Sequence, residues 1–101
     1  MARFDVYENL HPETRVAIPY LLDIQHSLHE RLRSRLVIPF SREAREVEGL
    51  YPAVTVRGEK LVALVPEMGG ISRDQLGKRV GNLASEASKI LNAIDLLITG
   101  F

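Results

Sequence analysis

The stretch AVTVRGEKLVALV, residues 53–65, carries the strongest structural signal in the chain. Both of its halves are rich in β-branched residues, and the turn between them centres on Arg57-Gly58-Glu59. Two such segments around a short glycine-containing turn predict an antiparallel β-hairpin. The chain is therefore expected to form a β-sheet, with further strands on either side of this hairpin.

The N-terminal segment predicts a half-buried strand, because polar and apolar side chains alternate in residues 3–7. One face of this strand would carry Phe4 and Val6, and the other would carry Asp5 and Tyr7. One face is therefore expected to meet a core and the other to meet solvent.

Two more strands are expected before the hairpin. Residues 17–24 are mostly apolar and predict a buried strand, in which Asp23 needs a hydrogen-bond partner if it is buried. Residues 36–40 predict another short strand. Pro39 cannot donate to a ladder, so we expect it at a strand end or at an edge. The charged segment 41–49 predicts either a short helix or a loop.

The C-terminal part predicts a helix. Apolar residues recur there at helical spacing and form one stripe, which consists of Leu83, Ala87, Ile90, Leu91, Ile94, Leu97 and Ile98. This stripe is expected to be core. Asn82 or Ser85 could cap its start, and Gly100 can stop it in a left-handed conformation. Just before it, residues 71–76 are ambiguous: Ser72 and Gln75 match a capping box, which favours a helix start. Several short strands followed by one helix indicate an α+β, β-dominated or barrel-like fold.

Length and composition restrict the classes of function. The chain has 101 residues, so we expect one domain over residues 1–101. Lys plus Arg and Asp plus Glu both number 13, which argues against binding nucleic acid through the net charge, although a local patch remains open. There is no cysteine, so no disulfide or thiolate site exists. The start has no apolar leader region and predicts a mature protein, and no apolar run predicts a membrane span.

Few residues suggest catalysis, since no phosphate-loop, nucleophile-elbow or zinc-protease motif is present. His11, His26 and His29 could suggest a metal site, but no carboxylate spacing supports the set, so exposed histidines and no cofactor are expected. Arg31 and Arg33 alternate with apolar or small residues up to Arg35. On a strand this pattern would make a basic row, which could hold a phosphate but is more typical of a solvated strand face.

Four segments, taken in order, resemble the CcdB toxins of bacterial toxin–antitoxin pairs over essentially the whole chain. They are Phe4-Asp5-Val6-Tyr7; Tyr20-Leu21-Leu22-Asp23-Ile24-Gln25 with Arg35-Leu36-Val37-Ile38-Pro39-Phe40; Leu50-Tyr51-Pro52-Ala53-Val54-Thr55-Val56 with Met68; and Asn92-Ala93-Ile94-Asp95-Leu96-Leu97-Ile98-Thr99-Gly100-Phe101. The resemblance implies an SH3-like, barrel-type twisted antiparallel sheet with a small second sheet and one C-terminal helix. In that fold residues 71–76 would form a strand, against the capping-box interpretation.

The resemblance also implies a non-enzymatic mode of action. The protein would be a cytoplasmic homodimer that binds the A subunit of DNA gyrase and traps the cleaved DNA complex. A CcdA-like antitoxin would remove it from gyrase through a segment that folds on binding. Neither direct sequence-specific binding of nucleic acid nor a membrane is implied.

By resemblance, the gyrase-binding positions are Leu28, Asp95, Ile98, Thr99, Gly100 and Phe101, with Phe4 and Tyr7 in support. From the residues alone, packing is favoured for Phe4 and Ile98, and contact for Gly100 and Phe101. This chain departs from the best-known members of the family at the tip. Thr99 stands where they have Trp, Phe101 replaces a terminal Ile, and Asp95 replaces Asn. Loss of a large aromatic anchor weakens binding unless Phe101 takes over its role.

Two other functions remain open at this stage. The MazF-type endoribonucleases share the expected fold, and fold does not fix function. In that case the arginine row would bind phosphate, and His26 or His29 would act as general acid or base. The other alternative is a non-toxic relative that only binds the antitoxin.

Overall fold

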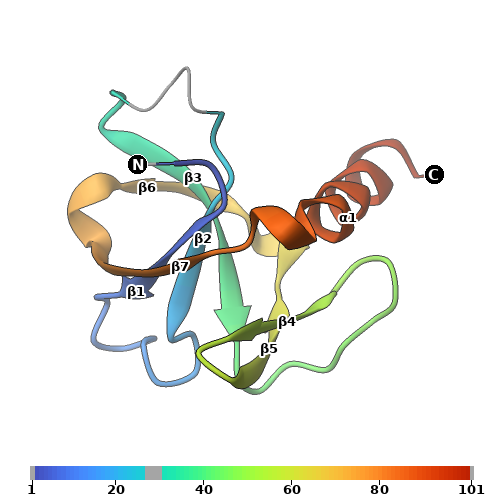
Figure 1. Cartoon of the computed structure of the whole chain (residues 1–101), viewed down its shortest axis with the longest axis horizontal. Coiled ribbons are helices and arrows are strands. Elements are labelled where there is room, and N and C mark those ends of the chain that lie inside the picture. Colours follow the sequence, from blue (N-terminus) through green and yellow to red (C-terminus); the bar gives the residue numbers. More distant parts are fainter. Residues whose placement is uncertain (1, 27–30, 101) are drawn as a thin grey trace.

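The computed structural model describes residues 2–26 and 31–100. Within these residues, seven strands form one antiparallel sheet, with the order β4-β5-β3-β2-β1-β7 and with β6 paired to β3. The strands are β1 (Asp5–Asn9), β2 (Tyr20–Asp23), β3 (Ser34–Ser41), β4 (Ala53–Val56), β5 (Glu59–Ala63), β6 (Gly69–Ser72) and β7 (Leu76–Asn82). The sheet curls into a half-barrel, and one helix, α1 (Ala87–Thr99), follows it (Figure 1). The predicted β-dominated α+β class is confirmed.

The predicted hairpin is confirmed as β4 and β5, which pair from Val56↔Glu59 to Ala53↔Val62. The two residues between the strands, Arg57 and Gly58, have φ angles of 52° and 79°. Positive φ at both central positions is the type I′ turn, whose twist matches that of the flanking strands. The Gly at position 58 therefore fixes the register of this hairpin.

Strand β3 is the centre of the sheet, because it pairs with β2 on one side and with two strands on the other. Along that second side it pairs with β6 up to Val37 and with β5 from Phe40 onward. Pro39 lies between these two pairings. The expectation of a strand end or an edge is therefore wrong for Pro39, which interrupts no ladder because the partner strand changes there. The expected small second sheet corresponds to β6, a branch of the same sheet.

Residues 71–76 contain the end of one strand, a turn and the start of another. Ile71 and Ser72 end β6, the one-turn 3-10 helix η3 (Arg73–Gln75) follows, and Leu76 begins β7. The Ser72 Oγ accepts a hydrogen bond from the Asp74 N–H at 3.3 Å, so the capping signal was real. It caps only one turn, however, because β7 returns to pair with β1. The prediction of a helix start is therefore wrong, and a continuous strand is also incorrect.

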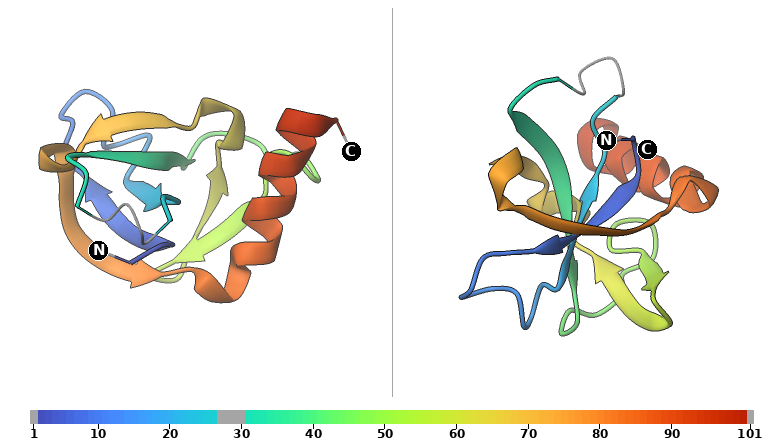
Figure 2. Two further views of the ribbon diagram at one scale, coloured as in Figure 1. Left: turned by 90° about the horizontal axis from the view of Figure 1, so that it is seen from above. Right: turned by 60° about the vertical axis from the view of Figure 1, so that its left-hand side comes forward.

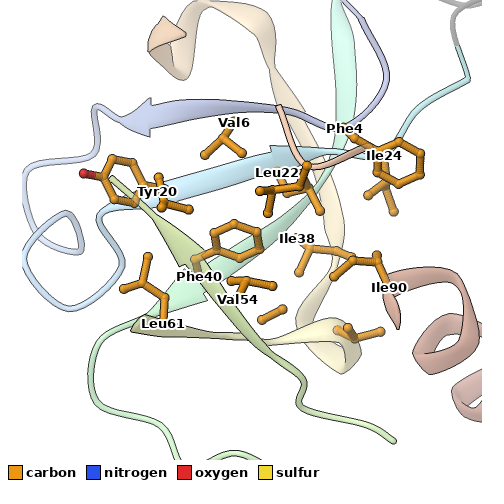
Figure 3. Close-up of a cluster of buried hydrophobic side chains, with 14 of the residues drawn as sticks. Phe4, Val6, Tyr20, Leu22, Ile24, Ile38, Phe40, Val54, Leu61 and Ile90 are labelled. Carbon is orange, nitrogen blue, oxygen red and sulfur yellow. The ribbon is translucent and has the colours of Figure 1, made fainter. Parts of the chain in front are cut away.

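The core lies on the concave side of the sheet and is closed by α1. Its side chains come from β1 to β5, and Ile90 and Ala93 of α1 join them (Figure 3). Lys89 donates a hydrogen bond of 2.8 Å to the Ala53 carbonyl, and η2 (Val65–Glu67) lies against the helix. The helix is therefore held on the sheet by its middle.

The helix starts later than the apolar stripe predicts. Leu83 is buried but precedes η4 (Ala84–Glu86), whose Ala84 N–H is capped by Asn82 Oδ1 at 2.8 Å. Gly100 ends α1 with φ 78°, as predicted. The segment 41–49 is a loop after Ser41, which settles the alternative left open there. No helix in residues 2–26 and 31–100 has the length and apolar character needed to cross a membrane.

Candidate functional site

The apolar stripe of α1 leaves the core before the helix ends. Ile90 is fully buried and Ala93 nearly so, whereas Leu97 is 40% and Ile98 is 70% exposed. The preference for packing at Ile98 is therefore wrong for the single chain. The sheet that covers the middle of α1 does not extend under its last turn (Figure 2). An exposed β-branched side chain thus lies at the tip of the molecule.

Two hydrogen bonds at the tip give the helix end a defined shape. The Thr99 hydroxyl donates to the Asp95 carbonyl at 2.6 Å, and the Gly100 N–H donates to the Leu96 carbonyl at 3.0 Å. Gly100 takes up the left-handed conformation that a helix end favours. Asp95, Ile98, Thr99 and Gly100 are all exposed and lie within two turns of helix. The structure thus brings together four of the residues expected at the binding site.

Two further expected contacts, Leu28 and Phe101, lie outside the described residues, as does His29. Phe4, expected to support the tip, is 7% exposed and belongs to the same core cluster as Ile90. Its φ of 70° is unusual for an aromatic residue and costs about 1–2 kcal/mol. Hydrogen bonds from its N–H to the Asp23 carbonyl (2.6 Å) and from the Leu83 N–H to its carbonyl (2.8 Å) hold it there.

Tyr7 lies on the other face of β1, away from the core cluster, beside a buried carboxylate. The prediction that this face meets solvent is wrong, because Tyr7 is only 8% exposed. Asp5 is 3% exposed; its Oδ1 accepts from Arg79 (2.8 Å) and Asn82 (2.9 Å). Its Oδ2 accepts from the Ala2 N–H (2.8 Å) and the Tyr7 hydroxyl (3.3 Å). Burial acts to raise the pKa of Asp5, but the bonds from Asn82, Arg79 and Ala2 outweigh it and lower the pKa. Burial, together with the Asp5 charge, raises the pKa of Tyr7 to about 12.

The predicted arginine row is broken by a buried ion pair. Arg31 and Arg33 precede β3 and are exposed, whereas Arg35 is fully buried against Asp23, also fully buried. Arg35 Nη2 and Nε lie 2.8 and 3.0 Å from Asp23 Oδ2, and the Gln25 N–H bonds the other carboxylate oxygen at 3.0 Å. The expected partner of Asp23 is thus found. The sequence did not predict this pair, because Asp23 lies in an apolar strand and Arg35 in the arginine row.

A hollow of about 610 Å³ opens between the outer face of β1 and the segment that joins β6 to β7. It is lined by Tyr7, Arg33, Ser72, Arg73, Asp74 and Leu76. The helix tip lies at the opposite end of the molecule (Figures 1 and 2). Sequence reasoning missed this hollow, since Arg73 and Asp74 stood inside a presumed capping box. In residues 2–26 and 31–100, no three His, Asp or Glu side chains lie close enough to hold a metal ion.

Comparison with known families identifies the chain. The family model described as CcdB protein matches residues 3–100, nearly the whole length. A comparison with curated proteins finds no match. The order of strands followed by one helix agrees with the resemblance in the four segments quoted above. The chain therefore belongs to the CcdB family, the toxins of toxin–antitoxin pairs.

Proposed function

We propose that this protein binds the A subunit of DNA gyrase through the tip of α1 and traps the cleaved DNA complex. The observation that carries the proposal is the exposed Ile98 beside a left-handed Gly100, in a chain of the CcdB family. A few well-packed residues near the centre of an interface supply most of its binding energy. Ile98, with Leu97 beside it, offers such a centre.

The tip supports binding rather than bond cleavage. The Thr99 hydroxyl already donates to the Asp95 carbonyl, so its proton is engaged within the helix. Asp95 is exposed, as a carboxylate at a polar rim would be. Thr99 is too small to replace a tryptophan anchor. Ile98 therefore makes the main apolar contact, and Phe101 is the second expected contact.

A two-fold partner is part of the proposal. The toxin acts in the cytoplasm as a homodimer, with one tip from each subunit facing the two A subunits of gyrase. A symmetric toxin can then engage a symmetric target with the same residues twice. A CcdA-like antitoxin reverses the complex by binding the dimer. The ribonuclease alternative loses support, because its third arginine, Arg35, is buried against Asp23.

The test is cleavage of supercoiled plasmid by gyrase and ATP in the presence of the toxin. The whole chain and a chain truncated after Ile98 are compared, with DNA released by detergent and protease. We expect linear DNA to accumulate with the whole chain and to return to background with the truncated chain. Equal cleavage by both chains would show that residues 99–101 are not needed for the contact with gyrase. A folded dimer that gives no cleavage in either form would contradict gyrase poisoning.

A further inference from the structure

The hollow at the sheet end of the molecule is separate from the proposed gyrase-binding tip. Its volume of about 610 Å³ falls in the range of small-molecule sites, about 300–1,000 Å³. Such sites are usually lined mostly by apolar side chains, whereas five of the seven residues that line this one, Arg33, Arg73, Ser72, Asp74 and Tyr7, carry polar groups. Its lining therefore suits a charged ligand.

The two arginines are held near one another by the backbone. The Arg73 N–H donates to the Arg33 carbonyl at 2.8 Å, next to the Ser34↔Ser72 pair that starts the β3–β6 ladder. Neither guanidinium forms an ion pair or side-chain hydrogen bond with another residue of the described chain. Their donors thus remain available on the wall of the hollow.

The charge of the hollow is positive. Arg33 and Arg73 contribute two positive charges and Asp74 one negative charge, so one positive charge is left over. Tyr7 is neutral, and its hydroxyl proton is directed to Asp5. Asp5 in turn is paired with Arg79, outside the lining of the hollow. The positive charge of Arg33 and Arg73 is therefore not neutralised by Asp5, which lies beside Tyr7.

We propose that this hollow binds a phosphorylated ligand of about nucleotide size, held through its phosphate by Arg33 and Arg73. The guanidinium fork matches two phosphate oxygens at once, and two forks meet three or four of them. The Asp74 carboxylate accepts from a hydroxyl or amino group on the rest of the ligand. A free nucleotide and one unit of a single-stranded nucleic acid offer the same phosphate chemistry. The formal net charge of the chain is zero and favours neither of them.

Binding is measured on the whole protein with adenosine 5′-monophosphate, adenosine and a single-stranded thymidine tetranucleotide, by amide chemical shifts and calorimetry. We expect the monophosphate to shift the amides of Arg33 and of residues 72–77, and adenosine to leave them unchanged. Arg33→Ala and Arg73→Ala should each weaken binding about tenfold or more. Arg73→Lys should recover part of the loss, because it keeps the charge without the fork.

Arg45→Ala is the matched control, since Arg45 is an exposed arginine of the loop that follows β3 and does not line the hollow. It removes the same charge and should leave the affinity unchanged. Tighter binding of the tetranucleotide than of the monophosphate would identify the single strand as the source of the phosphate. Equal affinities would identify the free nucleotide. The proposal is overturned if no probe binds at about millimolar concentration. Equal binding by the Arg73→Ala and Arg45→Ala proteins, or shifts confined to the helix tip, would also overturn it.

Discussion

The sheet end and the helix end of this molecule place polar and apolar groups in opposite ways. At the sheet end, Asp23 and Arg35 are fully buried and Asp5 is nearly so. At the helix end, Ile98 is 70% exposed. The buried charges all have partners, so they fix the geometry of the sheet. Under the proposed function the exposed isoleucine contacts gyrase, so substitutions at the two ends should have separable effects on stability and on toxicity.

The largest effect is expected from breaking the buried ion pair. Arg35→Met leaves the Asp23 carboxylate buried without its cation, which should lower the free energy of unfolding by about 3–5 kcal/mol. The double variant Arg35→Met with Asp23→Leu should recover most of this loss, because no buried charge remains. Urea denaturation measures both variants. A loss below about 1 kcal/mol in the single variant would show that water or another group satisfies Asp23.

The second prediction compares two isoleucines of one helix. Ile90→Ala removes a fully buried side chain and should cost about 2–5 kcal/mol of unfolding free energy. Ile98→Ala should change that free energy by no more than about 0.5 kcal/mol, but should reduce plasmid cleavage by gyrase. Equal destabilisation by the two substitutions would mean that Ile98 is buried in the dimer, and analytical ultracentrifugation would then show dissociation.

The third prediction concerns alkaline pH. Because the pKa of Tyr7 is raised from 10 to about 12 in the folded protein, the folded state holds its proton more tightly than the unfolded state. The corresponding stability is present below pH 10 and is lost as the pH rises toward 12. Tyr7→Phe should remove this loss, of at most about 3 kcal/mol. Unfolding curves of both proteins at pH 9 and at higher pH measure the difference, and parallel decline would contradict the raised pKa.

The smallest effect is expected at the end of the helix. Gly100 has φ 78° and open space around its Cα, so Gly100→Ala meets only backbone strain. We expect the free energy of unfolding to fall by about 1 kcal/mol, or the last turn of α1 to fray instead. Thermal unfolding measures the first outcome and amide exchange at Gly100 the second. An unchanged protein by both measurements would show that the left-handed conformation is not required.

Much of the fold could be predicted from local patterns. The hairpin at 53–65 and the helix stop at Gly100 depend on residues close in sequence, where turn chemistry decides the conformation. The pairing of Asp23 with Arg35 joins residues twelve positions apart across two strands, and the sequence carries only the need for a partner. The exposure of Ile98 was hidden for a similar reason: helical spacing shows a stripe but not where the covering sheet ends.

The hollow could not be predicted because it depends on the turn between β6 and β7. Ser72 acts as a cap, as its position suggested, but the pairing of β7 with β1 limits the helical segment to three residues. This long-range pairing brings Arg73 beside Arg33, which is forty positions earlier in the chain. No local pattern reports such a contact.

The most direct test of the central claim is the affinity of the whole protein for the gyrase A subunit, with and without Ile98→Asp. The substitution places a charge where the apolar contact is expected, on a side chain that the sheet does not cover. We predict binding by the unsubstituted protein and a loss of at least about a hundredfold in the variant, with unchanged unfolding and an intact dimer. Equal affinity of the two folded proteins would contradict the assignment of gyrase binding to the tip of α1.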